Sequence, residues 1–241
     1  MTPSRRRAAF DAADAKAFLD ASAAWPPRAT LLAAIDRLAE QQDAGDSMGG
    51  PSTRRAVDLG CGAGTETLEL LQRGWQVHAI DAHRSCLEFT RRRAEEAGVA
   101  SRLTLECREF EELVLPPRGY ALAHAGFSLP FCRSEAFGRL WRQVSESVRP
   151  SGCFAGQFFD EREPLMLGAP RGSVTFHDRS SIERLLGDER RPMWSAINLE
   201  EIDRPGRGPR GEPKHWHVFH ALFERTSAPP PRDGGDGADS V

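Results

Sequence analysis

Short apolar runs alternate with longer amphipathic segments along most of this chain. Five of the runs are brief enough to be buried strands: 57–59, 75–80, 103–107, 120–125 and 153–159. Apolar residues recur at helical spacing in the segments between them, at 65–73, at 84–97 and from Ser134 onward. Gly74 and Gly98 stand where glycines commonly end helices. This alternation predicts a mostly parallel sheet with helices on both faces.

The last third of the chain follows a different pattern. Ser180 to Glu183 has the spacing of a capping box, which predicts a short helix ending at Gly187. Met193–Asp203 and His215–Arg225 then predict two strands, joined by a polar loop with three prolines, Pro205, Pro209 and Pro213. Because no helix separates these strands, we expect a closing antiparallel pair.

One domain accounts for the whole pattern. We expect a single domain over residues 10–225, with an N-terminal helical cap at about 10–45 that includes a helix from Arg28 to Gln42. The flanking residues 1–9 and 226–241 have the composition of disordered segments.

Composition narrows the class of protein. A formal net charge of −3 over 241 residues gives no basic field for nucleic acid. The five cysteines are odd in number and lack C-x-x-C spacing, which indicates reduced thiols in a cytoplasmic protein. No apolar stretch reaches the roughly 18 residues of a membrane span, and no apolar segment follows Arg5–Arg7 as an export signal requires. We expect a monomer or homodimer that binds neither nucleic acid nor membrane.

The chemistry is concentrated where the first two strands end. The first strand runs into Gly60, Gly62 and Gly64, so that backbone N–H groups can approach a polar ligand. Asp81 ends the second strand 21 positions after Gly60, about the separation needed to reach a ribose diol. The third glycine of a dinucleotide fingerprint is replaced by Thr65, which argues against an NAD-dependent oxidoreductase. The pattern predicts a nucleoside-binding site.

The run from Asp58 to Gly64 resembles the first motif of class I S-adenosylmethionine-dependent methyltransferases. This resemblance implies a three-layer α/β, Rossmann-like sheet of seven strands, mostly parallel with a reversed last strand. It also implies S-adenosylmethionine as cofactor and methyl transfer as the reaction. The residues that it places around the cofactor are Asp58, Leu59, Gly60, Cys61, Gly62, Gly64, Asp81, Ala82, Glu109, Phe110, Phe127 and Arg28.

The resemblance also implies roles. Asp58 and the glycines would shape the methionine and sulfonium side, and Asp81 would hold the ribose. Glu109 and Phe110 would hold the adenine, although Glu109 also fits a solvated acidic run. Cys61 is interpreted as a small packing residue. Arg28 would meet a carboxylate of cofactor or substrate.

Two departures from the family pattern bear on function. The acid often found near the start of the fourth strand is Ala121 in this chain, which leaves open a binding protein that keeps the cofactor without turnover. The Asn/Asp-Pro-Pro-Tyr signature is absent, which argues against nucleobase or glutamine amide acceptors.

Three further segments, 127–132, 157–160 and 211–220, resemble a bacterial subgroup related to tellurite-resistance and small-molecule methyltransferases. The subgroup's own substrates are not carried over to this chain. We expect a small-molecule acceptor, and the alternatives are a metalloid acceptor or a cofactor-binding protein without turnover.

Histidines supply the candidate general bases, since imidazole accepts protons near neutral pH. His215 is the first candidate and His124 and His177 are lesser ones. His215 and His124 also fit hydrogen-bonded packing roles, and His177 also fits a cap of the helix that follows. Strand alternation puts His215 and His217 on one face and His220 on the other, so the three cannot converge on one metal ion. We therefore expect no metal site. We also expect Lys214, His215 and Trp216 near the pocket and His220 away from it.

Overall fold

The computed structural model describes residues 12–43, 54–163, 172–188, 191–208 and 211–226. The segments predicted to be disordered, 1–9 and 226–241, lie outside these ranges except for Thr226. Within them, no helix is long and apolar enough to cross a membrane.

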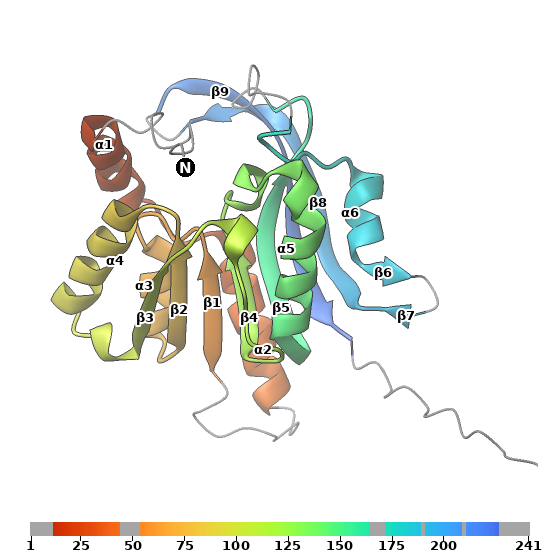
Figure 1. Cartoon of the computed structure of the whole chain (residues 1–241), viewed down its shortest axis with the longest axis horizontal. Coiled ribbons are helices and arrows are strands. Elements are labelled where there is room, and N and C mark those ends of the chain that lie inside the picture. Colours follow the sequence, from red (N-terminus) through yellow and green to blue (C-terminus); the bar gives the residue numbers. More distant parts are fainter. Residues whose placement is uncertain (1–11, 44–53, 164–171, 189–190, 209–210, 227–241) are drawn as a thin grey trace, which may run out of the picture.

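A seven-stranded sheet, in the order β3-β2-β1-β4-β5-β9-β8, forms the centre of the described chain (Figure 1). Its strands are β1 Arg55–Leu59, β2 Gln76–Asp81, β3 Leu103–Cys107, β4 Tyr120–Ala125, β5 Val148–Phe159, β8 Trp194–Arg207 and β9 Pro213–Arg225. The pairs from β3 through β5 are parallel, and β9 runs antiparallel to both β5 and β8. The predicted Rossmann-like sheet with only its last strand reversed is therefore confirmed.

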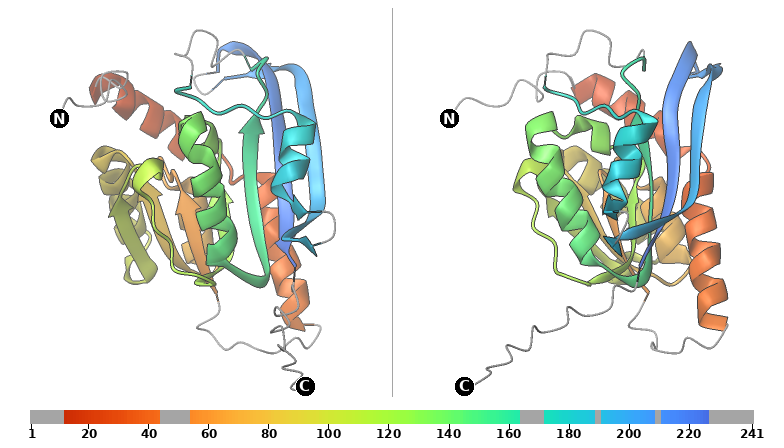
Figure 2. Two further views of the ribbon diagram at one scale, coloured as in Figure 1. Left: turned by 45° about the vertical axis from the view of Figure 1, so that its right-hand side comes forward. Right: turned by 90° about the vertical axis from the view of Figure 1, so that its right-hand side faces the viewer.

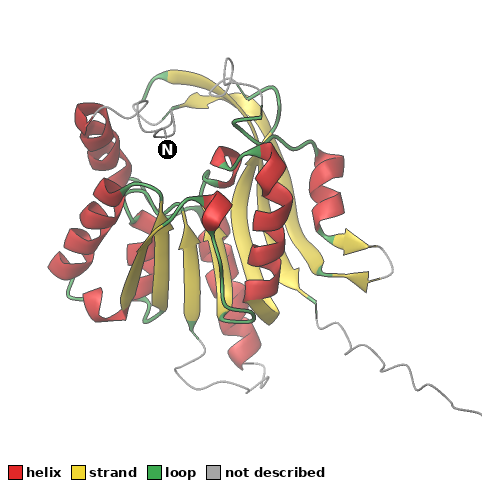
Figure 3. Cartoon of the chain, in the orientation of Figure 1, coloured by secondary structure: helices red, strands yellow, loops and turns green. Residues whose placement is uncertain are grey.

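Helices cover both faces of this sheet (Figures 2 and 3). Their bounds are α1 Ala12–Ala23, α2 Ala29–Asp43, α3 Thr65–Gln72, α4 Arg84–Glu96, α5 Ser134–Ser147 and α6 Arg179–Leu185. Buried residues of α2, α3 and α4 form one core cluster, and those of α5 and α6 form another on the opposite face. Short 3-10 turns occupy Ala100–Arg102, Phe110–Glu112 and Leu129–Phe131.

Strand alternation decides which core each side chain enters. Val57 and Leu59 of β1 pack with α5, whereas Ala56 packs with α2 and α3. Asp58 therefore points to the α2–α3 face, where Thr67 of α3 donates a hydrogen bond to it. A buried carboxylate is tolerated there because a donor meets it.

The loops at the carboxyl edge are built to approach the strands closely. Gly60 has a φ of +74°, and a Cβ at this position would overlap the side chain of Ser128. Gly64, also at +74°, would place a Cβ 2.5 Å from Thr90 Oγ1. Both positions therefore require glycine, for its left-handed backbone and for space.

The last two strands extend further than the polar loop and its prolines predict. Pro205 pairs with His215 and Arg207 with Pro213, so two of the three loop prolines lie inside the β8–β9 ribbon. Proline is tolerated because β8 is an edge strand and Pro213 is the first residue of β9. The ribbon rises beyond the end of β5 and bends toward α1 in the view of Figure 1.

The region before β8 also differs from the prediction. The side chain that caps α6 is Asp178, which accepts a hydrogen bond from the Ser181 backbone N–H, so the helix begins before Ser180. Gly187–Asp188 and Arg191–Pro192 then pair as a small separate sheet, β6–β7, which the periodicity does not signal.

His177 lies in the α5–α6 core, where burial lowers the pKa of its imidazole from 6.5 to about 4. Its ring packs 4.5 Å from that of Phe137 and 5.3 Å from that of Phe158, measured between centroids. The folded protein therefore holds the neutral ring. Stability from this group is complete above pH 6.5 and is lost as the pH falls toward 4, because only the unfolded chain then takes up the proton.

We expect His177→Leu to make the protein less acid-sensitive, by up to about 3 kcal/mol of unfolding free energy between pH 7 and pH 4. Urea unfolding of wild type and variant across this range measures the effect. Parallel stability curves for the two proteins would show that burial of His177 does not contribute to acid sensitivity.

Candidate functional site

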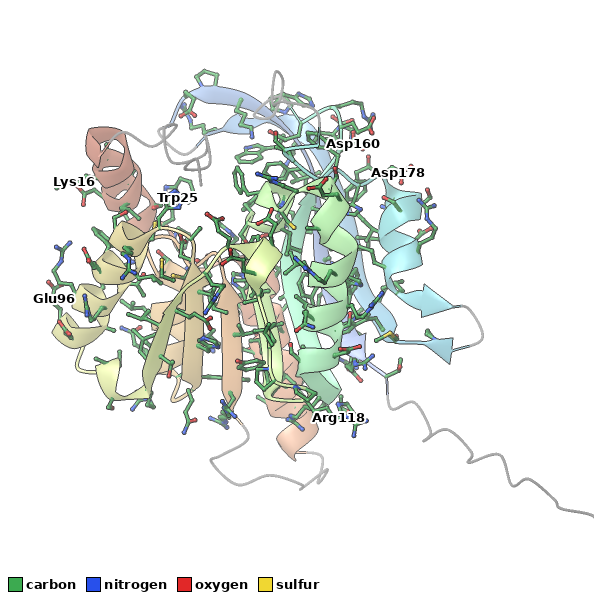
Figure 4. All side chains as sticks on the ribbon, in the orientation of Figure 1. Lys16, Trp25, Glu96, Arg118, Asp160 and Asp178 are labelled. Carbon is green, nitrogen blue, oxygen red and sulfur yellow. The ribbon has the colours of Figure 1, made fainter. Side chains whose placement is uncertain are left out.

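The residues predicted to bind a nucleoside meet at the carboxyl edge of the sheet. They come from the ends of β1, β2, β3 and β4 and from the loops that follow, while Arg28 immediately precedes α2. In Figure 4, Trp25 lies at this edge beside α1, Asp160 lies at the β5 side of the same edge, and Arg118 lies at the opposite edge. Ligands of open parallel sheets bind at this carboxyl edge.

Asp81 organises the glycine loop. Its carboxylate accepts hydrogen bonds from the backbone N–H of Gly62 at 3.0 Å and of His83 at 2.9 Å. The side chain is partly exposed, and a carboxylate with about four lone-pair sites retains capacity for a diol beyond these two bonds. Asp81 is thus joined to the β1 loop and remains able to meet a sugar.

The glycine loop itself leaves room on one side. A Cβ at Gly62 would meet nothing within 4 Å in the described chain, in contrast to Gly60 and Gly64.

Leu59 is fully buried and its carbonyl accepts a hydrogen bond from Ser128, so it can offer only backbone to a ligand. Burial raises the pKa of the Cys61 thiol well above its ordinary value, with further contributions from Asp81 and Asp58. A thiol in this state is a packing residue, as the sequence suggested, and not a nucleophile.

The predicted adenine side lies at the end of β3. The Glu109 side chain is exposed and its residue precedes the short 3-10 turn that Phe110 begins. Phe110 Cζ lies 3.7 Å from the Cβ position of Gly60, so its ring borders the glycine loop. Ala82 follows Asp81, and its carbonyl accepts a contact from Cys107 Sγ at 3.5 Å.

An aromatic group lies beyond the end of β4. Phe127 has a φ of +56°, and its backbone N–H donates to Gln157 Oε1 at 3.2 Å. Its ring contacts those of Phe159, Trp216 and His220, with centroids 5.9, 5.3 and 6.0 Å away. The Arg28 guanidinium lies 4.6 Å from the centre of the same ring. These side chains give this end of the edge an apolar surface bearing a cation.

The three predicted bases occupy different environments. His215 is exposed and pairs with Asp203 at 2.6 Å on the face of the ribbon opposite to Phe127. His177 lies in the α5–α6 core. His124 is 1% exposed, and its Nδ1 lies 3.1 Å from Asp58 Oδ1. Of the three, His124 alone lies beside the glycine loop.

The prediction that His220 lies away from the pocket is wrong. Alternation along β9 holds, but the face that meets Phe127 is the one bearing Lys214, Trp216 and His220. His217 instead joins Arg162 and Glu201 on the other face, through contacts of 2.7 and 2.9 Å from its Nε2. Long-range pairing of Gln157 with His220 fixes this choice, and no local pattern encodes that pairing.

Several residues of this edge had no sequence motif. Thr67 and Ser128 hold Asp58 and Leu59, and Gln157 joins the Phe127 backbone to Thr30 of α2 through a 2.9 Å hydrogen bond. A polar glutamine inside the apolar β5 run was the one available signal. Trp25, whose ring lies 5.7 Å from the Arg28 guanidinium carbon, belongs to the segment between α1 and α2.

The residues present fit an adenosyl ligand. The loop that follows β1 excludes side chains at Gly60 and Gly64, Asp81 lies at the end of β2, and His124 Nε2 is buried with no hydrogen-bond partner in the described part of the chain. A surface depression lined by Arg55, His78 and Tyr120 lies at the opposite, amino edge and includes none of the predicted site residues.

Comparison with known proteins agrees with this reading. Residues 56–152 match the family model described as "Methyltransferase domain". No curated protein matches the sequence. Over residues 56–152 this match agrees with the predicted resemblance to methyltransferases.

Solved structures with low sequence identity share the fold. TehB from Haemophilus influenzae has a TM-score of 0.59 at 14% identity, covering 78% of this chain and 62% of that one. A protein solved in work on conversion of a disulfide bond into a thioacetal group during echinomycin biosynthesis has a TM-score of 0.58 at 15% identity, covering 83% and 82%. Geranyl diphosphate C-methyltransferase from Streptomyces coelicolor, solved with S-adenosyl-L-homocysteine, has a TM-score of 0.57 at 15% identity, covering 82% and 77%.

Proposed function

Since residues 56–152 match a methyltransferase domain, we propose that this protein transfers a methyl group from S-adenosylmethionine to a small-molecule acceptor. The observation that carries the proposal is the joining of Asp81 to the glycine loop at the carboxyl edge of β1 and β2. The aromatic group around Phe127 would then receive the acceptor. Geranyl diphosphate C-methyltransferase, among the similar structures, is an enzyme of small-molecule chemistry.

S-adenosylmethionine supplies, when bound, a methyl carbon already activated by a sulfonium. The residues of this chain would hold the adenosine through Asp81, Glu109 and Phe110, and the glycine loop would present its backbone N–H groups. Phe127, Trp216 and Phe159 would exclude water from the acceptor, which favours displacement at carbon by alignment and a low dielectric.

The aromatic group also limits which residues can touch an acceptor. Its polar neighbours are Arg28, His220 and Lys214, whose Nζ lies 3.4 Å from the centre of the Trp216 ring and pairs with Glu163. Burial lowers the pKa of the His220 imidazole, so the ring is neutral at pH 7. His215 is separated from this group by the thickness of the ribbon. An acceptor held against Phe127 would therefore meet aromatic surface, one guanidinium and one neutral imidazole, with the Lys214 ammonium beside the Trp216 and Phe159 rings.

Calorimetry tests the cofactor half of the proposal. We expect S-adenosylhomocysteine to bind wild type with one site per chain, and NAD to give no heat. His78→Gln, which changes a histidine at the amino edge, serves as the matched control and should bind like wild type. Binding of NAD in place of S-adenosylhomocysteine would overturn the proposal in favour of an oxidoreductase.

A second assay tests turnover. Wild type is incubated with methyl-labelled S-adenosylmethionine and a panel of phenols, carboxylates, thiols, amines and tellurite. Label transferred to an organic member supports the small-molecule proposal, and label on tellurium would replace it with metalloid methylation. Binding without transfer to any class would indicate a cofactor-binding protein without turnover.

A further inference from the structure

Asp58 and His124 form a buried pair at the carboxyl edge. They are register partners on the neighbouring strands β1 and β4, and both side chains are at most 2% exposed. Asp58 Oδ2 accepts a 2.5 Å hydrogen bond from Thr67 Oγ1, and Asp58 Oδ1 lies 3.1 Å from His124 Nδ1. Both carboxylate oxygens are thus engaged inside the protein. Asp58 has no need of a ligand to satisfy it.

This pairing indicates which nitrogen of the imidazole carries the shared proton. An ionised carboxylate only accepts hydrogen bonds, so the proton between the two side chains belongs to His124 Nδ1. In a neutral imidazole the other nitrogen, Nε2, then carries a lone pair and acts as an acceptor. His124 Nε2 is buried and has no hydrogen-bond partner among the described residues. Buried polar atoms in folded proteins are nearly always hydrogen-bonded, so this acceptor calls for a donor that the described residues do not supply.

Arg28 supplies the complementary group. Its Nε is likewise buried without a hydrogen-bond partner in the described part of the chain. The guanidinium forms an ion pair with Glu66, at 3.7 Å between Nε and Oε1, which is longer than a hydrogen bond. The guanidinium is held in place by the Phe127 and Trp25 rings. It therefore offers an oriented donor to a carboxylate.

The two atoms converge on one glycine of the loop that follows β4. A Cβ built on Gly126 would lie 3.5 Å from His124 Nε2 and 3.2 Å from Arg28 Nε. It would also lie 2.9 Å from His124 Cε1, so a side chain at this position would displace the imidazole. Because Gly126 has no side chain, the acceptor His124 Nε2 and the donor Arg28 Nε both lie next to this loop.

We propose that His124 Nε2 and Arg28 bind the α-ammonium and the α-carboxylate, respectively, of the methionine end of the methyl donor. An ammonium has only donors and a carboxylate only acceptors, which matches the two groups that flank Gly126. Asp58 is a positioning residue, which acts by holding His124 in the Nδ1–H tautomer. The proposal rests on the proposed function, and it assigns His124 to cofactor recognition instead of proton abstraction.

Two ligands distinguish binding at this amino-acid site from binding of the adenosine. S-adenosylhomocysteine carries the amino-acid end, whereas 5′-methylthioadenosine has the same adenosine and a thioether without it. Their dissociation constants are measured by calorimetry for wild type, Asp58→Asn, His124→Leu, His124→Gln and the control His78→Gln. The ratio of the two constants within each protein cancels any general loosening of the fold.

We expect Asp58→Asn to lower affinity for S-adenosylhomocysteine at least tenfold and affinity for 5′-methylthioadenosine less than twofold. The asparagine amide would donate to Nδ1, which moves the ring proton to Nε2 and sets it against the ammonium. His124→Leu should have the same selective effect, and His124→Gln, which retains an acceptor, should recover part of the lost affinity. Nitrogen-15 NMR of the imidazole should show Nδ1–H in wild type and Nε2–H in Asp58→Asn.

Failure of the inference is distinguishable from failure of the function. Wild type that binds neither ligand overturns the proposed function. Wild type that binds both, with variants that weaken both equally or neither, overturns the inference alone. An Nε2–H tautomer or a doubly protonated ring in wild type does the same. If Asp58→Asn does not fold, the ratio measured for His124→Leu decides.

Discussion

Replacement of Gly60 with alanine should lower the free energy of unfolding by about 3 kcal/mol and abolish binding of S-adenosylhomocysteine. A left-handed backbone costs an L-residue roughly 1–2 kcal/mol, and forcing a methyl group into packed neighbours costs about 1–3 kcal/mol more. At Gly60 the methyl would overlap Ser128, whose hydroxyl donates to the Leu59 carbonyl. Relief of the overlap would therefore break the link between the β1 and β4 loops.

Gly62→Ala is the matched control for stability. Its φ of +53° also lies in the left-handed region, but a Cβ there meets nothing within 4 Å of the described chain. We expect a loss of about 1 kcal/mol, from backbone strain alone. Urea unfolding of the three proteins measures both effects. Equal losses for the two variants would show that contact with Ser128 does not restrict position 60.

The second large effect concerns Asp81. Asp81→Ala should weaken binding of both S-adenosylhomocysteine and 5′-methylthioadenosine tenfold or more, because two charge-assisted hydrogen bonds to the ribose, at about 1.5–3 kcal/mol each, would be lost. The glycine loop would also lose its acceptor for the Gly62 backbone N–H. Loss of affinity for both ligands distinguishes this variant from those at His124.

Asp160→Asn provides the matched control, because Asp160 also follows a strand at the carboxyl edge but is paired with Arg162 at 2.7 Å. We expect calorimetry to give wild-type affinity for that variant. Unchanged affinity in Asp81→Ala would refute the ribose assignment and leave the acid with a purely structural role in the loop.

Local patterns predicted the parallel part of the sheet well. β3 and β4 have the boundaries expected from their apolar runs, Leu103–Cys107 and Tyr120–Ala125. Gly74 and Gly98 end α3 and α4 with positive φ angles, as their positions indicated. These features succeed because they depend on neighbours close in sequence: periodicity for strands, and a left-handed residue for helix ends.

Features that depend on distant partners were not predictable in the same way. Alternation separated His215 from His220 but could not say which of them meets Phe127, because pairing between β5 and β9 decides that. Likewise Asp58 was recognisable as a motif acid, whereas its partners Thr67 and His124 emerge only when α3 and β4 pack against β1. The local pattern predicts a loop at Pro205, because proline is unfavourable inside a strand. The structure accommodates it in β8 since β8 is the edge of the sheet, which no local pattern encodes.

The β8–β9 ribbon has a consequence for how such a molecule can diversify. β9 pairs with β5 only as far as Val218, while its pairing with β8 continues to Pro213. The part of the ribbon beyond β5 lies after residue 152, where the family match ends. The loops predicted to bind adenosine and this part of the ribbon are therefore encoded by separate stretches of chain. A change in the length or sequence of the ribbon tip would thus alter which acceptors reach the methyl group, while the residues proposed to bind adenosine stay the same. Grafting ribbon tips between related folds is therefore a practical route to new acceptors.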